Sequence, residues 1–208
     1  MTTSVRGSAM DAAEGDRGNL PAFVGREADI QELRQAWRRA IGGRRQVVLL
    51  AGEPGMGKTT LVDQLAREVV ADGGRVLWGT CPPDPSTPYA PVAEILSGAA
   101  ASMPADVVSR YGVLAHVAPA LRLRTAHVPP LPDDRRELFH AAADLIAELA
   151  VTSPVLLVVD DLHRSHRTSV RLLQYVLAAT RQVPMLVVCT YCDTSVDRAH
   201  AVSSLLTE

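Results

Sequence analysis

The feature that most constrains the fold is an apolar run that passes directly into a glycine-rich loop. Residues 46–51 (QVVLLA) precede GEPGMGKT at residues 52–59, and a segment with helical periodicity follows. A short continuous apolar run predicts a strand buried on both faces, which is typical of parallel sheets covered by helices. The succession of strand, glycine loop and helix therefore predicts an α/β domain.

The glycine loop fits the phosphate-binding pattern G-x-x-x-x-G-K-[ST] in full. Glycines allow the backbone to curl so that its N–H groups face phosphate oxygens, and the following helix directs its positive end at the same anion. Lys58 is expected to contact the β- and γ-phosphates and to serve catalysis, and the Thr59 hydroxyl is expected to bind Mg²⁺. The only lysine of the sequence is Lys58. A chance glycine loop before a helix is the alternative, and the strand–loop–helix context argues against it.

The remainder of the chain continues the alternation of strands and helices. Apolar runs predict further strands at 75–80, 155–159 and 185–191, and helical spacing predicts helices from residue 27, at 58–70 and 92–102, after a cap at 133 or 134, and at 169–181. Proline-rich stretches at 82–91 and 129–132 predict loops. Residues 1–20 are small and polar without periodicity, so we expect a mobile tail followed by one domain over 21–208. The predicted fold class is α/β, a three-layer P-loop NTPase with a mainly parallel sheet of four recognisable strands.

Two adjacent acids end the strand predicted at 155–159. A carboxylate at the carboxyl end of a buried strand has no partner in the core, so it is expected to face the crevice where such sheets bind ligands. Asp160 is expected to hold Mg²⁺ through water, and Asp161 to orient or deprotonate an attacking water. The alternative is a pair of aspartates that opens a surface turn.

Composition excludes several classes of protein. The hydrophobic fraction of 47% supports a core, and 21 cationic against 23 acidic residues argue against a domain that coats nucleic acid or an anionic membrane. Three cysteines do not suggest a disulfide framework, and no run approaches the roughly 18 apolar residues of a membrane span. The N-terminus lacks the apolar stretch of a secretory signal, so we expect a cytoplasmic protein.

The nucleotide is expected to be an adenine nucleotide. Selection of guanine in small GTPases uses an N-K-x-D segment, and this chain has one asparagine, Asn19, in the predicted tail and one lysine in the glycine loop. The predicted cofactors are therefore ATP or ADP with Mg²⁺. The loop assigns nucleotide binding to Gly52, Glu53, Pro54, Gly55, Met56, Gly57, Lys58, Thr59 and Thr60.

Four motifs in order resemble one family. FVGRE (23–27), GEPGMGKTT (52–60), DDLH (160–163) and CTYCDT (189–194) resemble the nucleotide-binding module of STAND-type ATPases, in particular of large ATP-binding LuxR-family regulators. The resemblance implies that Val24 and Arg26 contact the base. It also implies a slowly hydrolysing switch within a transcriptional regulator, whose nucleic-acid binding and self-association depend on other segments.

The chain departs from the family pattern in two places that bear on function. Cys192 stands where the family usually has an arginine that senses the γ-phosphate, so weak discrimination between ATP and ADP is expected. The sequence ends at Glu208, where the resemblance implies that a fifth core strand and a helical lid would follow.

Three alternatives remain open. The chain is a stand-alone P-loop kinase or ATPase, or an interaction remnant that binds no nucleotide. A zinc site is also conceivable, because His163 and His166 follow one strand and Cys189 and Cys192 lie at the end of its expected neighbour. The stronger interpretation of Cys189 is a buried apolar residue.

Overall fold

The computed structural model describes residues 2–6, 26–84 and 86–192. The strands are β1 (Thr2–Arg6), β2 (Gln46–Ala51), β3 (Arg75–Thr80), β4 (Val155–Asp160) and β5 (Met185–Tyr191). The α-helices are α1 (Glu27–Ile41), α2 (Lys58–Ala71), α3 (Ala90–Ala101), α4 (Ala105–Ser109), α5 (Arg135–Thr152) and α6 (Arg167–Ala179). Short 3₁₀ helices are η1 (Gly112–His116), η2 (Pro119–Leu123) and η3 (Leu162–Arg164).

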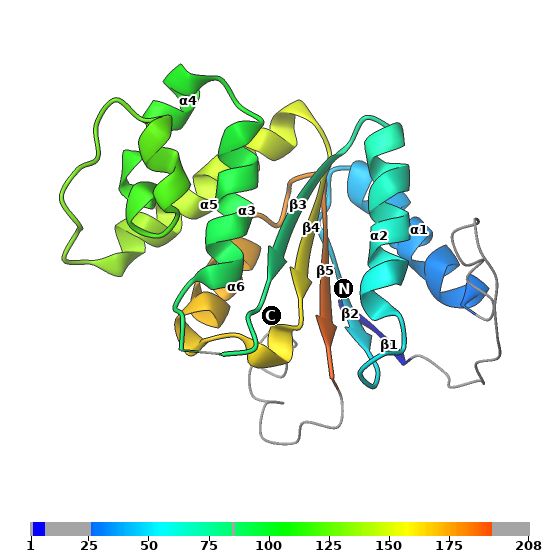
Figure 1. The fold of residues 1–208 in the computed structure, drawn as a ribbon. Helices are drawn as coiled ribbons and strands as arrows, with labels where there is room; N and C mark the ends of the chain where they lie inside the picture. Colours follow the sequence, from blue (N-terminus) through cyan, green and yellow to red (C-terminus); the bar gives the residue numbers. More distant parts are fainter. Residues whose placement is uncertain (1, 7–25, 85, 193–208) are drawn as a thin grey trace, which may run out of the picture.

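The strands form one parallel sheet between two layers of helices. Within the described residues the strand order is β1-β2-β5-β4-β3, and every pairing is parallel. Helices α1 and α2 cover one face of the sheet, and α3, α5 and α6 cover the other (Figure 1). The predicted α/β class and its three-layer architecture are therefore confirmed.

The continuous apolar runs are explained by alternation between two cores. In β2, Val47 and Leu49 pack with α3, α5 and α6, whereas Val48 and Leu50 pack with α1 and α2. Strands β4 and β5 alternate in the same way. Both faces of these strands are buried, so their side chains are apolar at successive positions.

The sheet has a strand that the sequence analysis did not predict. Residues 1–20 were expected to be a mobile tail, but Thr2–Arg6 form β1, which pairs with β2 from Thr2 beside Val47 to Arg6 beside Ala51. That expectation is wrong for residues 2–6, and the other tail residues lie outside the described part of the chain. The segment TTSVR is rich in β-branched residues, and the edge of β2 offers backbone groups with which a strand can pair.

Helix boundaries differ from the predicted ones where the caps are unusual. Asp134 caps α5 as predicted, since its carboxylate accepts a hydrogen bond from the Arg136 N–H at 2.9 Å. Helix α6 begins two residues before the predicted Ser169, because His166 Nδ1 accepts the Thr168 N–H at 3.1 Å. Histidine is not among the preferred capping residues, so this helix start could not be predicted from residue preferences.

Helix α3 lies against the end of β3 and closes the second helical layer. A Cβ at Gly79 would lie 2.1 Å from the Pro91 carbonyl oxygen, so this close approach requires glycine. In the described part of the chain, no helix has the length and apolar character needed to cross a membrane.

Candidate functional site

The carboxyl ends of three neighbouring strands bring the predicted site residues together. Strand β5 lies between β2 and β4, with Leu50 beside Thr190 and Val159 beside Cys189. The glycine loop leaves β2 and the two acids end β4, so both reach the same edge of the sheet. Ligands of open parallel sheets bind at this edge.

The glycine loop has the backbone conformation that its sequence predicts. Gly55 and Gly57 have positive φ values of 83° and 73°, a region that disfavours residues with a Cβ. Gly57 is the N-cap of α2, so the first N–H groups of this helix have no intrahelical carbonyl to bind. They and the positive end of the helix form a site for an anion.

Lys58 lies at the base of the loop and is 7% exposed. Its Nζ donates hydrogen bonds to the carbonyl oxygens of Gly52 at 2.8 Å and Glu53 at 2.9 Å. The ammonium is thus held beside the loop within reach of whatever the loop encloses.

Asp160 connects the loop to the sheet. The Thr59 hydroxyl donates to Asp160 Oδ2 at 3.0 Å, and the Thr190 hydroxyl donates to Asp160 Oδ1 at 2.5 Å. The carboxylate is nearly buried, and two hydroxyls satisfy it. A carboxylate beside a hydroxyl is a set of hard oxygen donors that suits Mg²⁺, so Thr59 and Asp160 fit the metal role expected of them.

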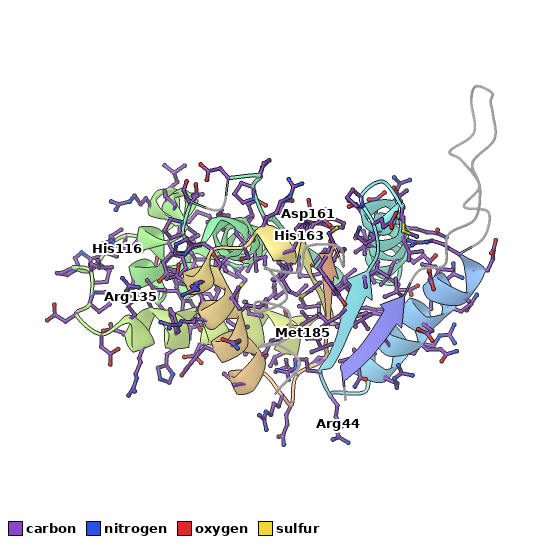
Figure 2. All side chains as sticks on the ribbon, turned by 90° about the horizontal axis from the view of Figure 1, so that it is seen from below. Arg44, His116, Arg135, Asp161, His163 and Met185 are labelled. Carbon is purple, nitrogen blue, oxygen red and sulfur yellow. The ribbon has the colours of Figure 1, made fainter. Side chains whose placement is uncertain are left out.

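Asp161 turns back toward the same cavity. Side chains alternate along a strand, so a regular continuation of β4 would send Asp161 to the opposite face from Asp160. Instead Asp161 has a left-handed backbone with φ of 57°, and its N–H donates to the Thr190 hydroxyl at 2.9 Å. Its carboxylate lies 3.9 Å from His163 Nδ1 and 3.7 Å from Arg164 Nε. Figure 2 shows Asp161 and His163 close together and distant from Arg44, which precedes β2.

These groups enclose a cavity of about 360 Å³. Its lining residues are Pro54, Gly55, Gly57, Lys58, Thr59, Thr60, Asp161, His163, Arg164 and Cys192. Of the other predicted loop residues, Gly52 and Glu53 hold Lys58 through their carbonyls, and Met56 Sδ accepts the Glu53 N–H at 3.1 Å. The structure therefore brings the phosphate loop and the acid pair into one site.

Arg26 lies behind the loop and does not line the cavity. It is 8% exposed, and its Nε pairs with the Asp29 carboxylate at 3.5 Å. Both terminal guanidinium nitrogens are buried without a hydrogen-bond partner among the described residues. One of them lies 3.9 Å from the position of a Cβ at Gly52, which places Arg26 beside the start of the loop. Val24, its predicted companion on the base side, is outside the described residues.

Sequence reasoning assigned no site role to Thr190. It considered His163 only as a ligand of the zinc alternative, and Arg164 only as one of two arginines, with Arg167, that could replace the arginine missing at 192. A hydroxyl residue at the end of an otherwise apolar strand was the available signal for Thr190. The position of Arg164 depends on the left-handed backbone at Asp161, which the sequence does not predict.

The structure contradicts the zinc alternative. Cys189 is fully buried in the core with Cys81 nearby, and burial raises the pKa of each thiol to about 12. Cys192 instead lines the cavity, and its backbone N–H donates to His163 Nδ1 at 3.3 Å. Over the described ranges, no group of three or more His, Cys, Asp or Glu side chains is arranged to hold a metal ion.

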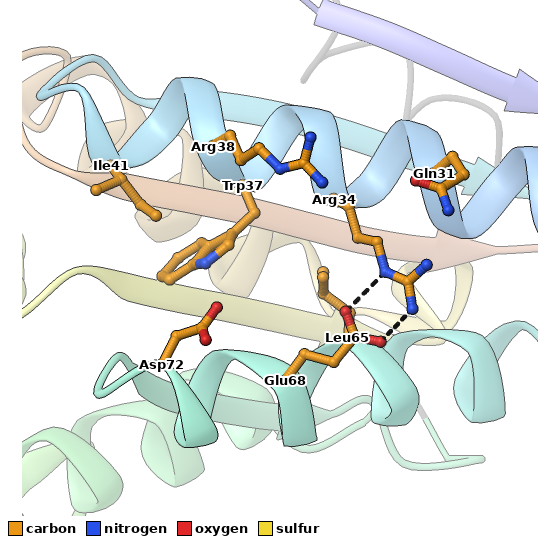
Figure 3. Close-up of a pocket in the computed structure, with 8 residues that line it drawn as sticks. All are labelled: Gln31, Arg34, Trp37, Arg38, Ile41, Leu65, Glu68 and Asp72. Atoms are coloured by element: carbon orange, nitrogen blue, oxygen red, sulfur yellow. Dashed lines mark hydrogen bonds and ion pairs between the residues drawn. The ribbon is translucent and has the colours of Figure 1, made fainter.

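A second cavity, of about 410 Å³, lies between α1 and α2 (Figure 3). Arg34 donates to both carboxylate oxygens of Glu68, at 2.8 Å and 2.5 Å, across this groove. The hydrogen bonds from Arg34 hold the pKa of Glu68 below its ordinary value. None of the predicted site residues lines this cavity, so it is distinct from the phosphate loop.

A parallel sheet with this glycine loop after β2 and two acids at the carboxyl end of β4 defines the class of P-loop NTPases. Comparison with known families agrees with that class. A family model described as "AAA ATPase domain" matches residues 22–188. The chain belongs to the AAA ATPase domain family.

Similarity to characterised proteins is local or limited to the fold. The chain is 42% identical to the DNA repair protein RadA of Chlamydia trachomatis serovar D over 55 residues, which are 25% of this chain and 12% of RadA. Its match therefore spans a small part of that relative.

Several solved structures are similar to this chain at low sequence identity. A Walker-type ATPase of Pyrococcus abyssi matches with a TM-score of 0.45 and 14% identity over 89% of this chain and 48% of that chain. A chain of the Drosophila ORC complex with AT-rich DNA and Cdc6 matches with a TM-score of 0.44 and 17% identity, over 87% of this chain and 52% of that chain. C. elegans PCH-2 matches with a TM-score of 0.41 and 17% identity, over 82% of this chain and 40% of that chain. The chain spans about half the length of these proteins or less.

Proposed function

We propose that this domain binds ATP and ADP with Mg²⁺, hydrolyses ATP slowly and serves as a nucleotide-dependent switch in a cytoplasmic signalling or transcriptional regulator. The observation that carries the proposal is the contact between Thr59 of the loop and Asp160 of β4, at 3.0 Å. Phosphate-binding and metal-binding groups from segments 101 residues apart meet there. The regulator context comes from the motif resemblance, and the nucleotide role from the site.

The loop and the start of α2 supply phosphate binding in this proposal. Backbone N–H groups of residues 55–60 bind the phosphate oxygens, and Lys58 places a positive charge at the β- and γ-phosphates. Thr59 and Asp160 would hold Mg²⁺, which when bound neutralises charge on the phosphates. Arg26 provides buried donors on the side of the loop where the base is expected.

Asp161 is the proposed general base. Its carboxylate lines the cavity beside the loop and is 38% exposed, so a water molecule can reach it. In the hydrolysis step a water oxygen bonds to the γ-phosphorus as the bond from that phosphorus to the bridging oxygen of ADP breaks. The proton of the water passes to Asp161, and phosphate and ADP are released.

The test is the affinity of the purified chain for Mg-ATP and Mg-ADP, by isothermal titration, together with phosphate release measured over hours. Lys58→Ala and Thr59→Ala should each weaken nucleotide binding by about tenfold or more, because hydrogen bonds to charged groups contribute about 1.5–3 kcal/mol. Arg44→Ala is the control, because Arg44 is exposed and lies before the amino end of β2, whereas the loop follows the carboxyl end of that strand.

The outcomes separate the candidate functions. Binding of both nucleotides with slow phosphate release supports the switch. Fast turnover would indicate a stand-alone ATPase, and a wild-type chain that binds neither nucleotide would be the interaction remnant.

A further inference from the structure

We propose that Arg164 is the residue that distinguishes ATP from ADP in this domain, by exchanging its contact with Asp161 for the γ-phosphate. This inference rests on the proposed nucleotide function and names a residue to which the motifs assign no role. It identifies the ligand group as a terminal phosphate of a nucleoside triphosphate.

The position of Arg164 supports this role. It ends η3, directly after the acids of β4, and lines the same cavity as Lys58 and Thr59. Lys58 is buried and tied to the carbonyls of the loop, whereas the Arg164 side chain is 36% exposed. Of these two cations, Arg164 is therefore the one free to move toward a ligand.

The present contacts of Arg164 are weak. Its Nε lies 3.7 Å from Asp161 Oδ2 and 3.4 Å from His163 Nε2, at or beyond the limit of a good hydrogen bond. In the described part of the chain these contacts involve Nε, which leaves both terminal nitrogens available to an anion. A guanidinium binds phosphate in a two-pronged geometry, and such bonds are stronger than a long ion pair with a carboxylate.

His163 connects Arg164 to position 192, where the motif resemblance implies an arginine. His163 Nδ1 accepts the backbone N–H of Cys192, and its Nε2 faces Arg164. Positions 164 and 192 thus line one cavity on either side of the same imidazole. An arginine at 164 supplies the positive charge that a cysteine at 192 does not.

The exchange also changes the state of Asp161. While Arg164 pairs with Asp161, its Nε lies 3.7 Å from carboxylate oxygen Oδ2, so this oxygen is engaged by the guanidinium. A γ-phosphate that draws Arg164 away leaves that carboxylate free to accept a proton. ADP lacks the γ-phosphate, so the Asp161–Arg164 pair persists with ADP bound.

Arg167 offers a matched control three residues away. It is the first residue of α6, is exposed and does not line the cavity. Replacing it removes the same charge from the same segment without touching the site.

The experiment compares the affinities of Arg164→Ala, Arg164→Lys and Arg167→Ala for Mg-ADP and Mg-ATPγS by isothermal titration. For Arg164→Ala the preference for ATPγS over ADP should fall by about tenfold, with ADP affinity within about twofold of wild type, because only the γ-phosphate contact is lost. Arg164→Lys should retain part of the preference, since lysine keeps the positive charge but lacks the two-pronged donor geometry of the guanidinium. Arg167→Ala should behave as wild type.

Two results would overturn the inference while the proposed function stands. These are an unchanged preference in Arg164→Ala, and an equal loss of ATPγS and ADP affinity. A wild-type chain that binds neither nucleotide would instead overturn the proposed function, and the inference with it.

Discussion

Thr190 occupies a central place in the site although it belongs to neither the loop nor the acid pair. Its hydroxyl donates to the Asp160 carboxylate and accepts the N–H of Asp161. One buried group therefore holds both acids, and it supports the left-handed backbone that directs Asp161 into the cavity. Such a conformation costs about 1–3 kcal/mol unless its surroundings stabilise it.

Replacing Thr190 with valine should therefore reduce both the free energy of unfolding and the proposed hydrolysis of ATP. Valine has nearly the same shape but leaves the partly buried Asp161 N–H without its Thr190 acceptor and removes a donor from Asp160, a loss of about 1–3 kcal/mol. Urea unfolding and single-turnover phosphate release measure the two effects.

Thr190→Ser is the control for this prediction, because it keeps the hydroxyl. If the serine and valine variants were equally impaired, the packing of the methyl group and not the hydrogen bonds would explain the loss.

The sequence predicted the loop at residues 52–60 and the acid pair, but not the contacts between strands. Short local patterns indicate the chemistry of Lys58, Thr59, Asp160 and Asp161 without knowledge of the fold. The role of Thr190 requires β5 to lie beside β4, which is a property of the sheet order. Proximity between distant segments is the information that one sequence does not contain.

At the scale of elements, α1 and α2 are joined by the Arg34–Glu68 pair across the second cavity (Figure 3). Arg34 lowers the pKa of Glu68 from its ordinary value of 4.5. A carboxylate with a lowered pKa in the folded state stabilises the protein above its unfolded-state pKa, and that stability is lost as the pH falls through the folded-state pKa.

Glu68→Gln should lower the free energy of unfolding at pH 7 by less than about 1 kcal/mol, because solvent screens a pair whose side chains are about one-third exposed. The difference from wild type should shrink below pH 4.5, where Glu68 protonates in the unfolded chain and then in the folded one. Chemical denaturation at a series of pH values tests this.

Asp63→Asn serves as the matched control, since the Asp63–Arg67 pair lies on the open surface of α2. A pH dependence that is the same for both variants would contradict the assignment to Glu68.

Element boundaries were predictable wherever burial or capping is encoded locally. The bounds of β2, β3 and β5 agree with the apolar runs, since residues buried on both faces leave a continuous pattern. Strand β1 escaped prediction because five residues at an edge need not be apolar on either face. The early start of α6 escaped because its cap is a histidine.

At the scale of the whole molecule, β1 covers the edge of the strand that leads into the phosphate loop. An uncovered edge presents unpaired backbone groups to other chains. Removing residues 1–6 should therefore lower the thermal midpoint and promote self-association, which light scattering after size exclusion detects.

Replacing residues 2–6 with a glycine–serine segment of equal length is the comparison for this deletion, since it keeps the chain but lowers its β propensity. Both variants should associate in the same direction. A monomeric deletion variant with an unchanged thermal midpoint would show that β1 contributes nothing to the sheet.

The strand order also sets when the site can exist during biosynthesis. Strand β5, the last strand described along the chain, inserts between β2 and β4, which carry the loop and the acids. A ribosome must therefore release residues up to Tyr191 before the two halves of the site have a common neighbour. Until then the nascent chain holds a phosphate loop and a pair of aspartates without the strand that aligns them. Pairing between segments so distant along the chain is slow, so the apolar strands remain exposed until β5 is available. We expect chaperones to bind the nascent chain mainly at this stage.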